Sequence, residues 1–218
     1  MMLISDPQSR PSFGVRLLAL LVDYSLILAY LAVLVLVALG TYALTGRLYD
    51  WLALGTAGAE LLGFIVLVLP VGLYLYLCEA SAHQATAGKR LLRLRVVDAS
   101  TGGRLSKPRV LVRTVVKLLP WEVAHFMVWQ TVAFTATGAA DFPAWLSVGL
   151  VVANVLPLIY IGMVLLQKDR RGPHDLVARS KVIRVGGVEA HMASMVEQEP
   201  GSFAAASEWP TRPRGGHR

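Results

Sequence analysis

Charged residues are scarce in this chain, and their scarcity argues against a soluble globular protein. Asp, Glu, Lys and Arg make up 16% of the 218 residues, whereas soluble domains usually carry about 25%. Hydrophobic residues reach 55%, and the mean hydropathy is +0.56. The few charges are concentrated between long apolar runs, which is typical of an integral membrane protein. This length suits one helical bundle and leaves little room for a second folded domain.

Three further absences narrow the function. The single cysteine, Cys78, excludes an intramolecular disulfide and a cysteine metal cluster. Residues 85–90 resemble a phosphate-binding loop only superficially, because that loop needs Gly where His83 stands and Ser or Thr where Arg90 stands. No nucleophile elbow or Ser–His–Asp arrangement stands out. We therefore predict neither an enzyme nor a cofactor, and no metal site.

Basic residues outnumber acidic ones by 21 to 14, which gives a net charge of +7. In a soluble protein this balance would point to nucleic acid. Here the Lys and Arg residues flank apolar spans, so membrane topology and anionic lipid headgroups explain them first. We therefore predict a bilayer with anionic headgroups as the partner, and no nucleic acid.

Four apolar segments are long enough to cross the bilayer as α-helices, which takes ~20 residues for about 30 Å. They cover about residues 17–44, 58–78, 118–139 and 145–166. The third is the least apolar, because Glu122, His125 and Gln130 interrupt it. The first exceeds the ~7–15 residues of a signal-peptide core and contains Asp23, so we expect it to be retained.

The distribution of basic residues predicts the orientation. Residues 10–16, 89–117 and 168–184 hold 17 Lys and Arg residues, whereas Arg47 is alone in the other two loops. Four crossings place all 17 on one side, which the positive-inside rule makes cytoplasmic. We therefore predict a multi-pass protein of the cell (plasma) membrane with both termini in the cytoplasm. Residues 1–12 read as a flexible cytoplasmic arm and 186–218 as a disordered cytoplasmic tail.

Two short stretches have the alternation of β-strands. Residues 94–98 alternate apolar and other side chains before a turn rich in Ser, Thr and Gly, and residues 181–185 show a similar pattern. Neither stretch has another evident partner. Because an unpaired strand edge is unfavourable, we predict that the two stretches pair in a small cytoplasmic β element.

A basic stripe precedes the third span. Arg109, Arg113 and Lys117 recur every four residues beside apolar ones, after the helix-start residues Ser106 and Pro108. This pattern predicts an interfacial amphipathic helix whose cations reach toward lipid headgroups. The expected fold is therefore an all-α membrane protein: a four-transmembrane-helix bundle with a small β element and this interfacial helix.

Asp23 is an ionisable residue inside an apolar span, and Arg16 lies seven residues before it on the same helical face. A carboxylate within a membrane bundle is a candidate ion or proton site. The alternative is a structural ion pair near the cytoplasmic interface, because the two residues are only about 10 Å apart along the axis. Both interpretations stay open.

Three polar residues in the later spans are weaker candidates for a polar lining. Glu122 and His125 share a helical face, but a metal site would need carboxylates from other helices, and Glu60 is expected at the opposite surface. A local hydrogen bond between Glu122 and His125 is the preferred interpretation. Asn154, in the middle of the fourth span, reads as an interhelical contact or as the lining of a polar pathway.

Four motifs in order resemble the RDD family of bacterial and archaeal membrane proteins, which is named for one arginine and two aspartates. They are FGVRLLALLVD at 13–23, TAGKRLLRLRVVD at 86–98, LVRT at 111–114 and HDLVA at 174–178. The resemblance covers about residues 13–185. It makes Arg16, Asp23 and Asp175 the three residues of the family charge cluster, and we expect Asp175 to lie near Arg16. Arg93 departs from the pattern where a small residue is expected, and so does the pair Arg179-Ser180.

The resemblance implies a membrane location and leaves two functional hypotheses. One is a transporter or ion-handling protein, including cation/proton exchange, that uses Asp23 and Arg16. Four spans without an evident repeat are few for a monomeric transporter, so transport would require a homo-oligomer. The other is a non-transporting scaffold or accessory subunit whose basic cytoplasmic face binds anionic lipid or a protein partner.

Overall fold

The computed structural model describes residues 11–186. The predicted arm at 1–12 and tail at 186–218 fall outside this range, except for residues 11, 12 and 186. The described chain is mostly helical. In order, its elements are α1 (Phe13–Thr45), the 3-10 helix η1 (Trp51–Leu54), α2 (Gly55–Gly63), the π-helix η2 (Phe64–Val68), α3 (Leu69–Ala80), α4 (Ala87–Leu91), β1 (Leu94–Asp98), α5 (Lys107–Ala136), α6 (Ala144–Leu166), α7 (Pro173–Val177) and β2 (Ser180–Arg184).

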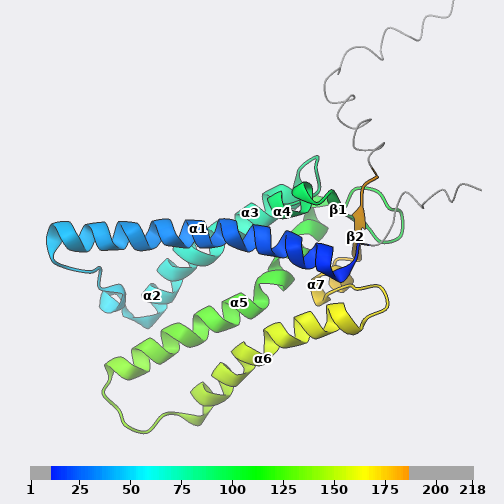
Figure 1. Ribbon diagram of the computed structural model, residues 1–218. Coiled ribbons are helices and arrows are strands. Elements are labelled where there is room, and N and C mark those ends of the chain that lie inside the picture. The colour runs from blue at the N-terminus through cyan, green and yellow to red at the C-terminus, as the bar shows by residue number, and fades with distance from the viewer. Residues whose placement is uncertain (1–10, 187–218) are drawn as a thin grey trace, which may run out of the picture.

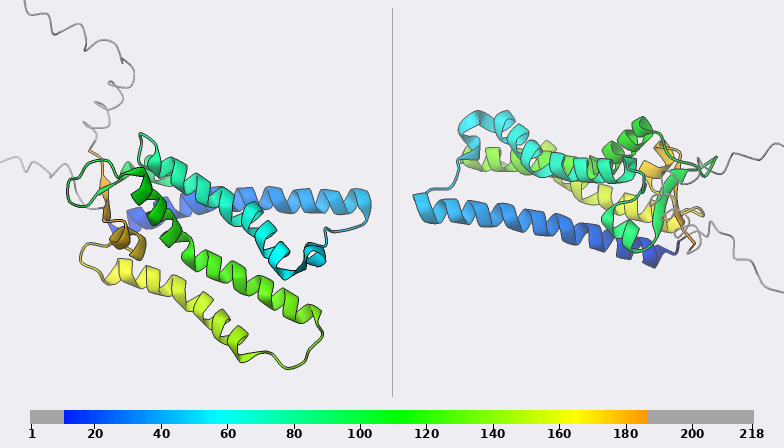
Figure 2. Two further views of the ribbon diagram at one scale, coloured as in Figure 1. Left: turned by 180° about the vertical axis from the view of Figure 1, so that it is seen from behind. Right: turned by 90° about the horizontal axis from the view of Figure 1, so that it is seen from above.

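The long helices converge at one end of the molecule and spread apart toward the other (Figures 1 and 2). The short elements α4, α7, β1 and β2 all lie at the converging end, which we call the sheet end. The opposite end, formed by the loops after α1 and after α5, is called the far end. α1 buries only Ala19 and Asp23, both in its first third, so its attachment to the rest of the bundle is concentrated near the sheet end.

Three helical segments are long and apolar enough to cross a membrane: Phe13–Thr45, Trp51–Ala80 and Ala144–Leu166. They correspond to the first, second and fourth predicted spans. α5 is also long, with 30 residues, and packs antiparallel to α6 (Figure 1). It does not reach the hydropathy of the other three within the described chain, since polar residues interrupt it.

A tyrosine of α1 compensates for the proline in the second span. Pro70 has no N–H, so the carbonyl of Val66, four residues earlier, loses its helical partner. The chain widens there into the π-helical turn η2, in which the Leu69 N–H bonds to the Phe64 carbonyl. The Tyr30 hydroxyl donates to the freed Val66 carbonyl at 2.6 Å. This contact joins α1 to the second span.

A second tyrosine, from α6, donates a hydrogen bond to the carbonyl that a proline leaves free in α5. Pro120 lies inside this helix and leaves the carbonyl of Val116 without its usual donor. The Tyr160 hydroxyl of α6 donates to that carbonyl at 2.8 Å. In both cases a proline in one helix creates a hydrogen-bond acceptor that a neighbouring helix uses.

The predicted β element is confirmed. β1 and β2 pair antiparallel, with Leu94 opposite Arg184 and Asp98 opposite Ser180. Their inner face forms the main apolar core together with α1 and the start of α5; its buried members are Ala19, Leu94, Val96, Leu105, Val110 and Val182. The strand alternation was therefore a reliable signal: the first strand has the predicted bounds, and the second is shifted by one residue at both ends.

The predicted interfacial amphipathic helix is wrong in its orientation. Residues 107–117 are the first turns of α5, continuous with the third predicted span. Three of their apolar side chains, Leu111, Val112 and Val115, are exposed, whereas Val110 is buried in the apolar core. The basic stripe faces the protein, because in a lipid environment apolar residues line the outside and charges pair inside.

Candidate functional site

Asp23 is held at the sheet end by donors from two other elements. Its Oδ1 accepts from the Tyr74 hydroxyl at 2.7 Å and from the Gly88 N–H at 2.9 Å, and its Oδ2 accepts from the Thr86 hydroxyl at 2.6 Å. The Tyr74 hydroxyl also accepts from the Ala87 N–H at 3.1 Å. The carboxylate thus accepts from the free Gly88 N–H at the start of α4, where a negative charge is favourable.

Close backbone contact makes this arrangement depend on a glycine. A Cβ on Gly88 would overlap the carbonyl oxygen of Ala19, and it would also crowd the Asp23 carboxyl group. Only glycine lets α4 approach α1 closely enough for the Gly88 N–H to reach Asp23. Thr86 and Gly88 of the Thr86-Ala87-Gly88-Lys89 motif therefore both bind the Asp23 carboxylate of α1.

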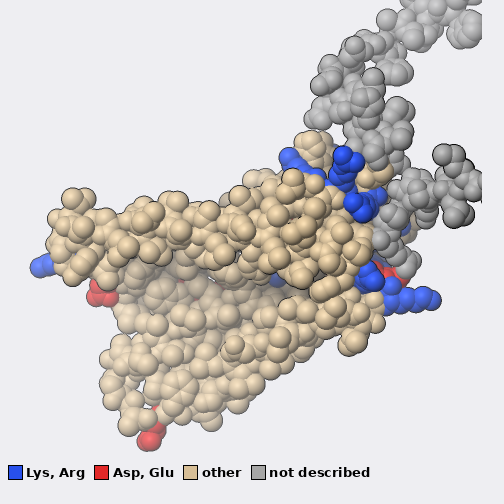
Figure 3. Space-filling view, viewed as in Figure 1, with Lys and Arg blue, Asp and Glu red and all other residues tan. Residues whose placement is uncertain are grey.

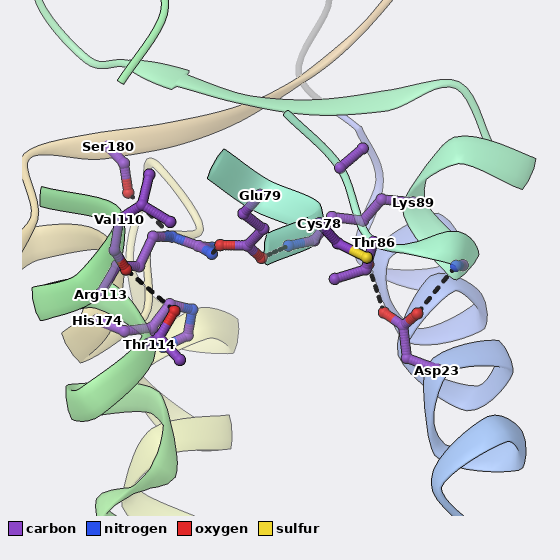
Figure 4. Close-up of polar contacts among 12 residues, drawn as sticks. Asp23, Cys78, Glu79, Thr86, Lys89, Val110, Arg113, Thr114, His174 and Ser180 are labelled. Carbon is purple, nitrogen blue, oxygen red and sulfur yellow. Dashed lines mark hydrogen bonds and ion pairs between the residues drawn. The ribbon is translucent and has the colours of Figure 1, made fainter. Parts of the chain in front are cut away.

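The lysine of the same motif belongs to a second, larger group of charges. We call Glu79, Lys89, Arg113 and Asp175 the charge cluster; its members come from α3, α4, α5 and α7, and all are buried. Figure 4 shows Glu79 between two cations, with Lys89 on one carboxylate oxygen and Arg113 on the other. Arg113, 1% exposed, bonds further to Asp175. Two positive and two negative groups thus balance within one buried network.

The Asp175 carboxylate accepts four hydrogen bonds within the charge cluster and its surroundings. Its Oδ1 accepts from the Arg113 Nη2 at 3.0 Å, from the Arg113 Nε at 3.2 Å and from the Ser180 hydroxyl at 3.0 Å. Its Oδ2 accepts from the Gly172 N–H at 3.4 Å and lies 3.6 Å from the His174 ring. These contacts fix α7 and the start of β2 against α5.

Three pKa values outside the long helices follow from this packing. Burial lowers the pKa of Lys89 to about 8, although Glu79 beside it acts in the opposite direction. Burial lowers the pKa of His174 to about 3, so the ring is neutral near pH 7. Burial alone would raise the pKa of Asp175, but Arg113, His174 and Arg16 outweigh it and bring the value below the usual range.

Arg16 does not pair with Asp23 in the described chain. Its guanidinium donates to two backbone carbonyls instead, those of Arg170 and Val182. Asp175 takes Arg113 as its direct partner rather than Arg16, which acts on it only through its nearby charge. The structural ion pair between Arg16 and Asp23, one of the two interpretations left open by the sequence, does not form: the two residues share a helical face, but each is bound by a different element.

The basic stripe also differs from its predicted role of facing lipid. Arg113 is wrong as a lipid-facing residue, because it is at the centre of the charge cluster. Arg109 is half-buried and donates to the Asp98 carboxylate and to the carbonyls of Ala178 and Arg179. Lys117 is half-buried. The stripe therefore points into the protein, where it meets carboxylates and carbonyls.

The weaker candidates stay apart from the charge cluster. Glu122 lies 3.6 Å from the His125 Nδ1, too far for a hydrogen bond, while the His125 Nε2 accepts from the Trp129 indole at 2.9 Å. Asn154 is exposed, and its amide donates to the Leu150 carbonyl of its own helix at 2.8 Å. Within residues 11–186, no group of three or more His, Cys, Asp or Glu side chains is placed to hold a metal ion.

Comparison with models of protein families identifies the family of this chain. The model of the RDD family matches residues 10–179. The chain belongs to the RDD family. Neither the curated proteins nor the solved structures gave a match. Arg16, Asp23 and Asp175, which the sequence resemblance assigns to the family's arginine and two aspartates, anchor three different junctions: α1 to β2, α1 to α4, and α7 to α5.

Sequence reasoning missed Glu79, which joins the two cations of the charge cluster in this RDD protein. The signal was available. Glu79 is an acidic residue at the end of an apolar span, directly before a segment that holds nine Lys and Arg residues up to Lys117. A carboxylate at that boundary needs a basic partner if it is buried.

Proposed function

We propose that this RDD protein is a non-transporting membrane scaffold whose basic face at the sheet end binds anionic lipid headgroups. One observation carries the proposal: the sheet end buries its acidic side chains, with the exception of the exposed Asp169, and displays most of its bases. Glu79, Asp98 and Asp175 are buried, whereas the exposed residues of this end include Arg90, Arg93, Arg104, Lys107, Lys168, Arg170, Arg179 and Arg184. Figure 3 shows the basic residues gathered there beside an almost uncharged helical surface. A surface of this kind attracts anionic headgroups, by about 1 kcal/mol per basic residue.

The proposal includes a fourth crossing by α5. Its 30 residues would extend about 45 Å, and two of its polar residues, Arg113 and His125, are buried against the bundle. Four crossings put both ends of residues 11–186 on one side, and the positive-inside rule makes that side the cytoplasm of a plasma membrane.

Thiol labelling in intact cells tests this topology. In a Cys78→Ala background, single cysteines at Asp50 and Asp141 at the far end should react with an impermeant reagent. One at Thr101 should not. Thr101 is preferred to Gly102, whose φ of +71° disfavours any other residue. Labelling of the Thr101→Cys variant from outside would overturn the topology.

Lipid extraction tests the scaffold function itself. Protein purified with its bound lipid from vesicles of equal phosphatidylcholine and phosphatidylglycerol should be enriched several-fold in phosphatidylglycerol. Replacing Lys107, Lys168 and Arg184 together by Gln should reduce the enrichment, because all three are exposed at the sheet end. Arg47→Gln, at the far end, is the matched control and should leave it unchanged. A wild-type protein without enrichment would reject the proposal.

Ion transport is the second candidate, because ionisable side chains continue from the charge cluster along α5. Lys117, Glu122 and His125 follow Arg113 in the sequence, over about 18 Å of helix. The few helices of one chain would make a homo-oligomer necessary. Against this candidate, Asp23 already has three hydrogen-bond donors. Saturable, pH-dependent cation flux in proteoliposomes would favour transport over the scaffold.

A further inference from the structure

A small cavity beside the β-sheet is surrounded by cations. It has a volume of about 160 Å³ and lies between the end of α4, the start of β1 and the end of β2. Its lining includes His83, Arg90, Arg93, Arg95 and Val185, and it contains no carboxylate. A second cavity at this end, beside Arg16, is lined by Asp169 as well as by basic residues. Only the first of these two therefore lacks an acidic group in its wall.

Arg93 occupies a backbone conformation that disfavours it. Its φ is +55°, in the left-handed region where glycine is the usual residue and other side chains are strained. The turn that joins α4 to β1 requires this conformation, and the Arg93 carbonyl accepts the Val185 N–H at 2.8 Å. An arginine at such a position is expected where its side chain contributes something that glycine cannot.

The guanidinium groups around the cavity keep their charge uncompensated. Arg90 donates to the Ala85 carbonyl at 3.1 Å and to the Ser81 hydroxyl at 3.3 Å, both neutral acceptors that orient the group. The Arg93 and Arg95 side chains have no hydrogen bond or ion pair among residues 11–186. Three arginines therefore border one cavity without a counter-charge, which favours a bound anion.

We propose that this cavity binds a phosphate group, carried either by a lipid headgroup or by a soluble phosphate ester. Arginine forks match the oxygens of phosphate in pairs and bind them more selectively than single charges do. The volume of about 160 Å³ leaves room for one phosphate group. The inference deepens the proposed binding of anionic headgroups and rests on it only if the phosphate comes from lipid.

Two arginine-to-glycine variants separate this site from general basic charge. Arg93→Gly removes a cation from the cavity and relieves its strained backbone. Arg179→Gly is the matched control, because Arg179 is also exposed, has a φ of +48° and lies outside the cavity wall. Both variants lose one positive charge at the sheet end, and neither is expected to lower the unfolding temperature. Arg93→Asn, which also accepts the left-handed region, replaces the glycine variant if that one fails to fold.

The measurement is the unfolding temperature of the full chain in phosphatidylcholine nanodiscs, titrated with inorganic phosphate at constant ionic strength. We expect saturable stabilisation of the wild type and of Arg179→Gly, with phosphate binding at least about tenfold weaker in Arg93→Gly. If the same pattern arises only in nanodiscs that contain phosphatidic acid, the phosphate comes from a lipid headgroup. Equal responses of the two glycine variants, or no response of the wild type to either probe, would overturn the site.

Failure of the site and failure of the scaffold proposal are distinguishable. If extracted protein is enriched in phosphatidylglycerol while Arg93→Gly behaves like Arg179→Gly, lipid binding by the basic face is supported and phosphate binding in the cavity is rejected. If phosphate binds as expected while the extracted lipid shows no enrichment, the cavity stands and the proposed scaffold function is rejected.

Discussion

The two ends of this RDD protein are built on different physical principles. At the sheet end, an apolar core that includes Leu94, Val96 and Val110 lies beside the buried charge cluster. Toward the far end, α1 buries no residue after Asp23, and the second core group comprises only Met127, Leu146 and Ala153. Lipid covers apolar side chains as well as protein does, so the far end needs little packing of its own.

The comparison shows where the specificity of the fold resides. In a bilayer, burial of apolar surface does not favour one helix arrangement over another, whereas an unpaired charge or carbonyl is unfavourable in every wrong arrangement. The contacts that select this fold are therefore polar, and most of them lie at the sheet end. Variants that remove such contacts should lower the free energy of unfolding far more than variants of the exposed apolar surface.

The largest loss is expected at Arg113. Arg113→Met leaves Glu79 and Asp175 buried without their shared cation, which should lower the free energy of unfolding by about 3–5 kcal/mol. Lys107→Met, exposed at the start of the same helix, should stay within about 0.5 kcal/mol. Denaturant unfolding in micelles measures both. Adding Glu79→Gln to Arg113→Met should recover part of the loss, and similar stabilities of the two single variants would contradict the account.

Gly88→Ala tests the contact between α1 and α4. The added methyl group would overlap the Ala19 carbonyl, so the expected loss is about 1–3 kcal/mol from overpacking. Gly40→Ala is the control, since a Cβ at Gly40 meets nothing within 4 Å, and it should leave the unfolding temperature unchanged or raise it slightly. A Gly88→Ala protein as stable as Gly40→Ala would show that α4 is not docked on α1.

The two proline-linked tyrosines test whether polar contacts also matter between the ends. Tyr30→Phe and Tyr160→Phe each leave a backbone carbonyl without a donor, which should cost about 1–2 kcal/mol. Tyr42→Phe, on the exposed part of α1, should change the free energy of unfolding by less than about 0.5 kcal/mol. If all three variants unfold together with the wild type, the tyrosines do not join the helices.

The last expected effect is a dependence of the free energy of unfolding on pH at the sheet end. The pKa of His174 is about 3 in the fold against 6.5 for a free side chain. As the pH falls from 6.5 toward 3, the unfolded chain gains a proton that the fold does not accept, so stability should decrease by up to about 1.4 kcal/mol per pH unit. His174→Gln should remove this slope in unfolding measured across the window. An equal slope in the variant would assign it to other groups.

Some features of this molecule could be predicted from its sequence because one local pattern determines each of them. Alternation predicted the pairing of β1 and β2, and three long apolar runs predicted three membrane-length helices. The family's preference for a small residue at Arg93 and at Arg179 also has a local cause, since both have a positive φ.

Charge partners were not predictable, because spacing along a helix does not say which element will approach it. Arg16 and Asp23 share a face of α1, yet β2 binds one and α4 binds the other. The basic stripe of α5 was assigned to headgroups by analogy with surface helices, whereas Arg113 pairs with two carboxylates distant in sequence. Glu79 was not predicted as a site residue because its partners, Lys89 and Arg113, lie on other helices rather than at helical spacing along its own helix.

Asp23→Asn provides the most direct test of the claim that the ionisable residues at the sheet end hold the fold together rather than carry ions. The Asn variant keeps the shape of the side chain but offers one acceptor oxygen where the carboxylate offers two. The account predicts a loss of about 1–3 kcal/mol in the free energy of unfolding and no pH-dependent cation flux in proteoliposomes of either protein. Flux through the wild type, lost in an Asn variant of unchanged stability, would contradict it.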